Sequence, residues 1–348
     1  MKSQTAPCSF YRGAGSGKSS IIAWLAGAGP QPDSGEKRLL LSKIRSSVKA
    51  VHFCRSGTGS ISPKTMAEDI ANQLTTQVDG FSDPLAASFP NRVQIIANIA
   101  DSKANSITGN YIKELSLGGL DDDSSFNLAI RDPLKKLYEL GYSERMIILI
   151  DALDEALTYT GGRTIVQIIS RLDDIPKQVR FIVTTGPDPR VLKHFQNVKP
   201  FDLVKHAPAD VNDINLYVME RLHIYNLDDE TMLRLAAKIS LTANSNFLYA
   251  HLLFNDILLH LPHIPAFIEH ELPHELGGLY TEFLNREIGV EAKEERWFNT
   301  FKPLLGLNAV SQGNGFTKSQ LSKMLDQDVE QPLRVCKQYL EGELPVLS

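Results

Sequence analysis

A glycine-rich segment close to the start of the chain restricts the possible folds more than any other feature. It extends from Gly13 to Ser19, between a short apolar run at residues 8–11 and an apolar helical pattern at residues 20–26. Glycines allow successive backbone N–H groups to face one side of a loop, and the helix that follows adds the positive end of its dipole. The order of strand, glycine loop and helix therefore predicts a loop that binds phosphate groups.

The positions of this loop have distinct expected roles. Backbone N–H groups would surround a polyphosphate, Lys18 would reach its β and γ phosphates, and the Ser19 hydroxyl would join the ligands of a Mg²⁺ ion. Arg12 stands where the full G-x-x-x-x-G-K-[ST] pattern has its first glycine, at the bend between strand and loop, so it affects affinity more than the identity of the site. The candidate nucleotide-binding residues of this Walker A segment are Gly13, Ala14, Gly15, Ser16, Gly17, Lys18, Ser19 and Ser20.

A second motif follows the apolar run at residues 146–150, which is typical of a central strand in a parallel sheet. Asp151 ends this run, at the place where open α/β sheets bind ligands, and we expect it to hold Mg²⁺ directly or through water as the Walker B residue. Asp154 and Glu155 follow within one turn, and one of the two carboxylates could orient or deprotonate an attacking water. An ordinary role as negative charges at a helix N-terminus stays open for both.

A third strand is expected at residues 181–185, ending in Thr184 and Thr185. In a nucleotide-binding sheet it would lie beside the strand that ends at Asp151, with its polar end placed to sense a γ phosphate. Thr185 is the candidate nucleotide contact from this strand, and Thr184 is the neighbouring choice. A plain strand end before the proline-rich turn at residues 186–190 is an equally open interpretation.

The ordered set of motifs resembles the NACHT family of STAND NTPases, and it is most similar to bacterial members that often carry WD40 repeats. Beyond the two Walker motifs, the resemblance is carried by residues 52–54 with 71–74, and by residues 181–190, 246–250, 272–280 and 302–306. Two positions depart from the family pattern. Gly186 stands where the family usually has an arginine that reads the γ phosphate, and no histidine follows His274, although the family often has a nucleotide-contacting histidine later in the chain.

This resemblance implies an ATP- or ADP-binding signal-transduction switch that hydrolyses ATP slowly and oligomerises on activation, in innate immunity, defence or cell-death signalling. Its partners would be the nucleotide and further copies of the NTPase module, whereas effector and sensor modules would lie outside this chain, which we expect to be a fragment or a truncated form. A nucleotide-binding scaffold without significant turnover is the alternative, favoured by Arg12 and Gly186. A ring motor or a P-loop kinase is a third alternative, but no lid arginine cluster or acceptor pocket is recognisable.

The composition is that of an ordinary globular protein, with 43% hydrophobic and 22% charged residues among 348. A formal net charge of −5 gives no electrostatic reason to expect nucleic-acid binding. Three cysteines that lie far apart, without a C-x-x-C pair, favour a reducing cytoplasmic location over a disulfide framework. No apolar run approaches the roughly 20 residues that a membrane-spanning helix needs.

Alternating strand and helix patterns predict an α/β fold, with a P-loop NTPase core and a three-layer parallel sheet over residues 1–205. Strands are expected at 8–11, 49–54, 146–151, 180–185 and 201–204. Helices are expected at 17–27, 63–78, 131–140 and 163–173. Residues 27–37 and 105–125 resemble loops, and the second of these contains an acidic triplet at 121–123. Helices at 210–222, 228–239 and 247–261 predict a helical lid domain over 206–275. The remainder, 276–348, is expected to be an incomplete winged-helix-like domain with Thr317 as a helix N-cap, although a helical bundle fits its periodicity as well.

Overall fold

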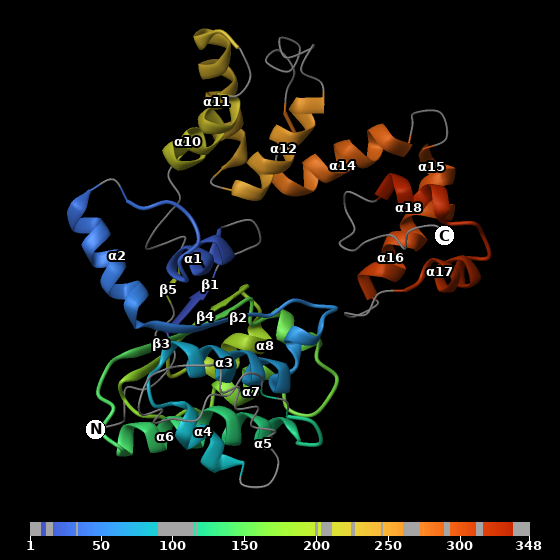
Figure 1. Ribbon diagram of the computed structural model, residues 1–348. Coiled ribbons are helices and arrows are strands. Elements are labelled where there is room, and N and C mark those ends of the chain that lie inside the picture. Colours follow the sequence, from blue (N-terminus) through green and yellow to red (C-terminus); the bar gives the residue numbers. More distant parts are fainter. Residues whose placement is uncertain are drawn as a thin grey trace, which may run out of the picture. The chain divides into compact units, whose positions relative to one another are not determined.

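The computed structural model divides the chain into two compact units, and the division falls between Ala207 and Pro208. The first unit is an α/β domain with a parallel sheet, and the described elements of the second are all helices (Figure 1). The residues that the structure describes are 8–11, 17–32, 34–89, 115, 117–198, 201–202, 211–223, 227–244, 246–259, 272–273, 275–288, 293–310 and 316–336. Within these ranges no helix has the length and apolar character needed to cross a lipid bilayer.

Five parallel strands form the sheet of the first unit, in the order β2-β3-β4-β1-β5. Their bounds are β1 Cys8–Tyr11, β2 Val48–Phe53, β3 Met146–Asp151, β4 Val179–Thr185 and β5 Phe201–Asp202. The strands expected at these places are confirmed, the first four to within one residue. β4 lies beside β3, as predicted. The continuous apolar runs explain why β3 and β4 are interior strands, since only an interior strand buries both of its faces.

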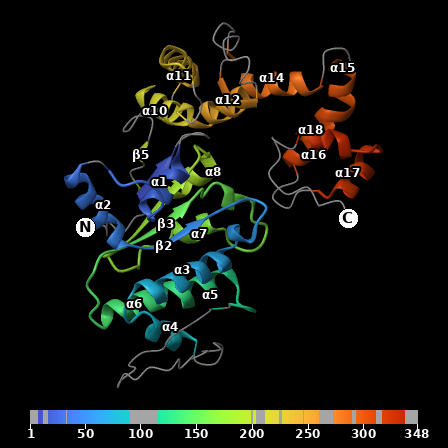
Figure 2. The same ribbon diagram turned by 45° about the horizontal axis from the view of Figure 1, so that its top comes forward.

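A layer of helices covers one face of this sheet and contains most of the apolar core of the unit (Figure 2). The layer comprises α3 Pro63–Gln77, α4 Ser82–Ser88, α5 Asp122–Phe126, η2 Asn127–Arg131, α6 Asp132–Glu139 and α7 Ile165–Ile169. Alternate residues of β3, from Met146 to Ile150, enter this core, and α3 meets them with Ile70 and Leu74. The two-residue period of the strand and the 3.6-residue period of the helix therefore bury their apolar sides at one interface.

The opposite face of the sheet carries α1 Lys18–Leu25, with α2 Gly35–Ser47 beside it. Ile22 of α1 and Leu149 of β3 are both buried, and neither belongs to the core on the other face. Near Leu149, β3 is therefore covered on both faces, by α1 on one side and by the helix layer on the other.

The helix α2 was not predicted, and the loop expected over residues 27–37 is wrong at its end, because this helix begins at Gly35. Leu39 and Leu40 of α2 are about 59% and 60% exposed, so the sequence shows no single apolar face that would reveal the helix. Arg45 joins α2 to α1, because its guanidinium donates to the carbonyl of Trp24 at 2.6 and 3.0 Å. That carbonyl lies in the last turn of α1, where a cation is favoured.

The acidic triplet lies at the start of α5 and not in a loop, which corrects the prediction for residues 122–125. Asp121 is the N-cap of the helix. Asp122 accepts a hydrogen bond from the Tyr159 hydroxyl at 2.9 Å, and Asp123 pairs with Arg163 at 2.8 Å. Each carboxylate thus has its own protein partner at the start of this helix.

The second unit consists of helices with separate apolar cores. Their bounds are α10 Val211–Leu222, α11 Asp229–Ala243, α12 Phe247–Leu259, α14 Glu275–Ile288, α15 Lys293–Arg296, η6 Trp297–Phe301, α16 Lys302–Val310, α17 Lys318–Leu325 and α18 Glu330–Cys336. The first four share a core around Tyr249 and Phe254, and a smaller core surrounds Leu304 and Leu321. The three helices expected before residue 262 are confirmed, as is the N-cap Thr317, whereas the finer division into a lid and a winged helix stays a prediction.

Candidate functional site

The carboxyl ends of β1, β3 and β4 meet at one edge of the sheet, because all the strands are parallel. The register places Tyr11, at the end of β1, level with Thr185 of β4, and Ile150 of β3 level with Val183. Asp151 is the next residue of β3 and lies beside Thr184. Two strand spacings, on the order of 10 Å, separate Asp151 from the end of β1. The candidate residues of β3 and β4 therefore lie close to the strand that leads into the glycine loop.

The start of α1 supplies the described part of the predicted phosphate loop. The other four residues of the loop lie outside the described residues: Gly13, Ala14, Gly15 and Ser16. Gly17 has a φ of 81°, a left-handed conformation that residues with side chains rarely adopt, and its carbonyl accepts the N–H of Ile21 at 3.0 Å. Lys18 is half-buried, whereas Ser19 and Ser20 are exposed in the first turn of the helix. An anion placed here would meet the N–H groups that the first turn leaves without helical partners.

Asp151 is buried, with an exposed fraction of 3%, and a hydroxyl holds its carboxylate. Thr184, also buried, donates to Asp151 Oδ1 and accepts the N–H of Ala152 at 2.9 Å. No described residue donates a hydrogen bond to the second oxygen, Oδ2. Because a buried carboxylate must be offset by donors or by a cation, Oδ2 has the character of a ligand-binding atom.

The chain turns sharply after Asp151. Ala152 has a φ of 53°, which places a residue with a side chain in the left-handed region. The turn is stabilised from β4, since the N–H of Leu153 donates to the carbonyl of Thr184 at 2.8 Å. A small side chain suits this position because a branched one would add steric strain there.

The carboxylates of Asp154 and Glu155 are tied to the loops that follow the two neighbouring strands. Asp154 Oδ1 accepts the N–H of Gly186, after β4, at 2.8 Å. Glu155 Oε2 accepts the N–H of Ser56, after β2, at 2.7 Å. Both residues are half-buried, at the start of the one-turn helix η3 Glu155–Thr158. They therefore have positions fixed by tertiary contacts, which isolated charges at a helix N-terminus do not need.

Gly186 and Asp154 occupy adjoining space. A Cβ atom built on Gly186 would lie 2.7 Å from Asp154 Oδ2, so a side chain at this position requires the carboxylate to move. Arg190, the nearest arginine along the chain, is exposed and pairs with Asp188 at 2.7 Å. Arg190 therefore does not take the place of the arginine that the family pattern has at position 186.

The two threonines at the end of β4 have different partners. Thr185 is buried, and its hydroxyl donates to the carbonyl of Gly186 at 3.0 Å. Thr184, the neighbouring choice for a γ-phosphate contact, is committed to Asp151 instead. The Thr184–Asp151 and Ser56–Glu155 pairs were not predicted, because nothing local in the sequence shows the strand register that joins residues so far apart in the chain.

Polar side chains of α3 hold the edge strand β2. The Gln73 side chain forms two hydrogen bonds with the backbone of Val51: its Oε1 accepts the N–H at 2.9 Å, and its Nε2 donates to the carbonyl at 2.8 Å. The His52 ring is buried and contacts Asp69 at 3.0 Å and the Ser60 carbonyl at 2.7 Å. The histidine and glutamine of the family-like pattern at 52–54 and 71–74 therefore position β2.

Cys54 follows β2 and lies near the acidic residues of the site. Burial raises the pKa of its thiol well above the ordinary value, and the negative charges of Asp151, Glu155 and Asp154 add to this effect. A thiol with a raised pKa stays protonated at neutral pH and is a poor nucleophile. The structure thus gives Cys54 a packing role beside the site.

The donor atoms at this edge suit Mg²⁺ held together with a nucleotide. Within the described ranges no group of three or more His, Cys, Asp or Glu side chains gathers into a metal site. Mg²⁺ usually retains water and binds through one or two protein oxygens and the phosphates of its substrate, so it needs no such group. The Asp151 carboxylate and the Ser19 hydroxyl are hard oxygen donors that fit this requirement.

No protein-family model matches the chain, and no curated protein matches it significantly.

Proposed function

We propose that the first unit is the P-loop core of a NACHT-like STAND NTPase, which binds ATP and ADP with Mg²⁺. The observation that carries this proposal is the buried Asp151, held by the Thr184 hydroxyl at the sheet edge where β1 leads into the glycine loop. The strand order supports it, because β4 lies between the glycine-loop strand and the Asp151 strand. A negatively charged ligand at the α1 N-terminus would then face a cation held by Asp151.

In nucleotide binding, the residues at this edge of the sheet would have different roles. With nucleotide bound, N–H groups of the glycine loop would surround the phosphates, and Lys18 would add a positive charge at the β and γ positions. The Ser19 hydroxyl and the Asp151 carboxylate would hold Mg²⁺, which when bound would neutralise charge on the phosphate oxygens. Thr184 keeps the Asp151 carboxylate in one orientation.

Hydrolysis requires a group that orients a water and accepts its proton as the oxygen bonds to the γ phosphorus and the bond to ADP breaks. Asp154 and Glu155 are the candidate carboxylates. Each has one oxygen fixed by a backbone N–H, Gly186 for Asp154 and Ser56 for Glu155. No described residue donates to Asp154 Oδ2, so this oxygen is the better placed acceptor.

A nucleotide-binding scaffold without significant turnover is the second candidate. One observation favours it: the place of the γ-phosphate-reading arginine is taken by Gly186, and the Arg190 guanidinium is paired with Asp188. Tight binding would then persist, since the glycine loop, Lys18 and Asp151 are all present, while charge on the γ phosphate would be stabilised less in the transition state.

The signalling part of the proposal rests on the family resemblance. A molecule that binds ADP in one arrangement of its modules and ATP in another shifts between the two when the nucleotides exchange. The helical unit after Pro208 would be the part that responds, and self-association through the NTPase module would follow activation. Slow hydrolysis would return the switch to its ADP-bound state.

The test is to purify the chain, release any bound nucleotide, identify it by chromatography, and then follow phosphate release from added ATP. Lys18→Ala should abolish both binding and turnover, whereas Lys37→Ala on the neighbouring α2 should change neither. Asp154→Asn and Glu155→Gln separate the two carboxylates, because the one that accepts the proton should lose turnover while it keeps binding.

Bound ADP with slow, Lys18-dependent turnover is the expected result. Bound nucleotide with no phosphate release would favour the scaffold. Failure to bind either nucleotide, with the chain folded by circular dichroism, would contradict the proposal.

A further inference from the structure

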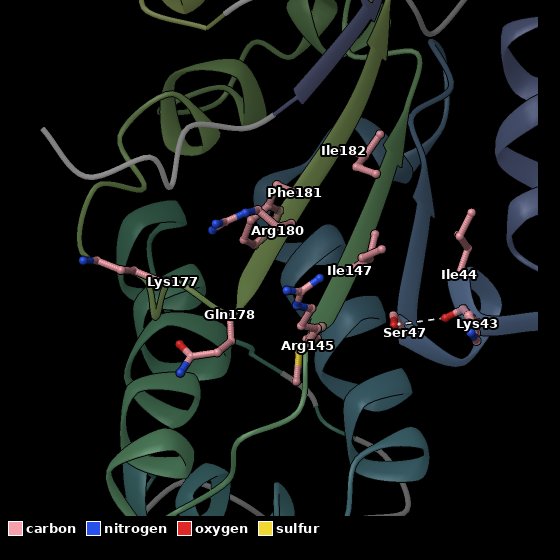
Figure 3. Close-up of a pocket in the computed structure, with 11 residues that line it drawn as sticks. Lys43, Ile44, Ser47, Arg145, Ile147, Lys177, Gln178, Arg180, Phe181 and Ile182 are labelled. Atoms are coloured by element: carbon pink, nitrogen blue, oxygen red, sulfur yellow. Dashed lines mark hydrogen bonds between the residues drawn. The ribbon is translucent and has the colours of Figure 1, made fainter. Parts of the chain in front are cut away.

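A pocket of about 870 Å³ lies at the opposite end of the sheet from Asp151, and the proposed nucleotide site does not use it. Residues at the start of β3, residues around the start of β4, and one side of α2 line it (Figure 3). Because the strands are parallel, their amino ends face away from the edge that holds the site residues. We refer to this feature as the basic pocket.

Positive charge dominates the polar side chains of the basic pocket. Lys43, Arg145, Lys177 and Arg180 line it, and none of the described aspartates or glutamates does. None of the four forms an ion pair with a described residue, although the chain as a whole carries a net charge of −5. Uncompensated cations gathered around one concave surface create a local positive potential that attracts an acidic ligand.

The rest of the basic pocket is apolar and only partly covered. Ile147 of β3, Ile182 of β4 and Ile44 of α2 line it and are half-buried, and Figure 3 shows the first two on the strands and Ile44 on the helix beside them. Interior strands of a parallel sheet are normally covered by helices on both faces. The α1 side of β3 and β4 therefore has an apolar area near the strand starts that α1 and α2 leave partly uncovered.

The apolar area continues onto the exposed side of α2. Leu40 lies one helical turn before Ile44, so the two side chains share one side of the helix. Leu40 is 60% exposed and extends the apolar side of α2 that begins at Ile44. The surface thus combines a stripe of apolar side chains with a border of cations.

We propose that the basic pocket and Leu40 form a docking surface for an acidic amphipathic helix of another protein. Helical shape follows from the sheet, since helices are the elements that cover a parallel sheet, and an apolar side would pack on Ile44, Ile147 and Ile182. Acidic character follows from the four cations, which would pair with carboxylates along the flanks of that helix. The proposal is independent of nucleotide binding at the other end of the strands.

The test uses the full chain and a fluorescein-labelled peptide of about 18 residues, five helical turns, with leucines along one side and glutamates elsewhere. Fluorescence anisotropy measures binding. A peptide of the same composition in scrambled order controls for the amphipathic pattern.

Two double variants test the charges of the pocket. Arg145→Glu with Lys177→Glu reverses two exposed cations that line it. Lys193→Glu with Lys323→Glu is the control, because it makes the same change in net charge at exposed lysines elsewhere. Leu40→Ser tests the apolar part, with Leu241→Ser in the second unit as its control.

The pocket charge reversal should weaken binding about tenfold or more, and Leu40→Ser about threefold or more, whereas both controls should stay within about twofold of the unaltered chain. Equal binding of the scrambled peptide, or equal loss in the charge controls, would show general attraction between charges and overturn the proposal. Displacement of the peptide by millimolar pyrophosphate, with no effect of Leu40→Ser, would show a small-anion site and would equally overturn it.

Discussion

Replacing Thr184 by valine removes one hydroxyl and changes the side-chain volume very little. That hydroxyl belongs to a residue that is 1% exposed, donates to a carboxylate that is 3% exposed, and accepts the N–H of Ala152. Loss of a hydrogen bond to a charged group costs about 1.5–3 kcal/mol, and an unpaired N–H in the half-buried Ala152 adds about 1 kcal/mol. The additional buried methyl group offsets about 0.8 kcal/mol. We therefore expect Thr184→Val to lower the free energy of unfolding of the first unit by about 2–3 kcal/mol.

Thr185→Val is the matched control, because Thr185 is equally buried and is the next residue of the same strand. Its hydroxyl donates only to the neutral carbonyl of Gly186, so the change should stay within about 1 kcal/mol. Urea denaturation followed by tryptophan fluorescence measures both variants. The chain has two tryptophans, Trp24 in the first unit and Trp297 in the second, so a Trp297→Phe background makes the signal specific to the first unit.

A double-mutant cycle with Asp151→Asn assigns the effect to this one pair of side chains. The coupling free energy between positions 151 and 184 should be about 1 kcal/mol or more. If Thr184→Val and Thr185→Val cost the same within about 0.5 kcal/mol, or if the cycle shows no coupling, the reasoning that Thr184 holds the Asp151 carboxylate is refuted.

Three further predictions address other parts of the chain. Gly186→Arg should raise the preference for ATP over ADP roughly tenfold, about 1.4 kcal/mol, as measured by calorimetric titration. Gly186→Ala moves Asp154 without adding charge, so it should lower turnover and leave the nucleotide preference unchanged. Gln73→Met removes both side-chain bonds to the edge strand β2 and should cost about 2 kcal/mol by urea denaturation. Gln73→Glu keeps the acceptor for the Val51 N–H but turns a carboxylate oxygen towards the Val51 carbonyl, so it should cost at least as much. Burial and the charge of Arg221 lower the pKa of His251, so the unfolded chain takes up this proton first as the pH falls below the unfolded value of about 6.5. The stability of the second unit should therefore decrease on acidification from pH 7 to about 5.5, and His251→Gln should reduce that decrease; an unchanged slope in urea titrations followed by circular dichroism would contradict the assignment.

Much of the first unit was predictable from local patterns. Strands β3 and β4 are interior, so their apolar runs are continuous and easy to recognise. Thr317 as an N-cap was likewise visible, since a threonine before a helical pattern satisfies the free N–H groups of its first turn. The helix α2 was missed because Leu39 and Leu40 are exposed, and a helix that buries little has no clear period.

The sequence by itself determined the residue types of the candidate site: a glycine loop followed by Lys18 and Ser19, and an apolar strand ending in Asp151. These features depend on neighbours along the chain, and so they are visible in the one-dimensional pattern. The tertiary structure alone decided that Thr184 holds Asp151 and that Ser56 fixes Glu155. Such contacts arise from the register of parallel strands, which is set by the packing of whole helices and strands rather than by the residues that finally meet.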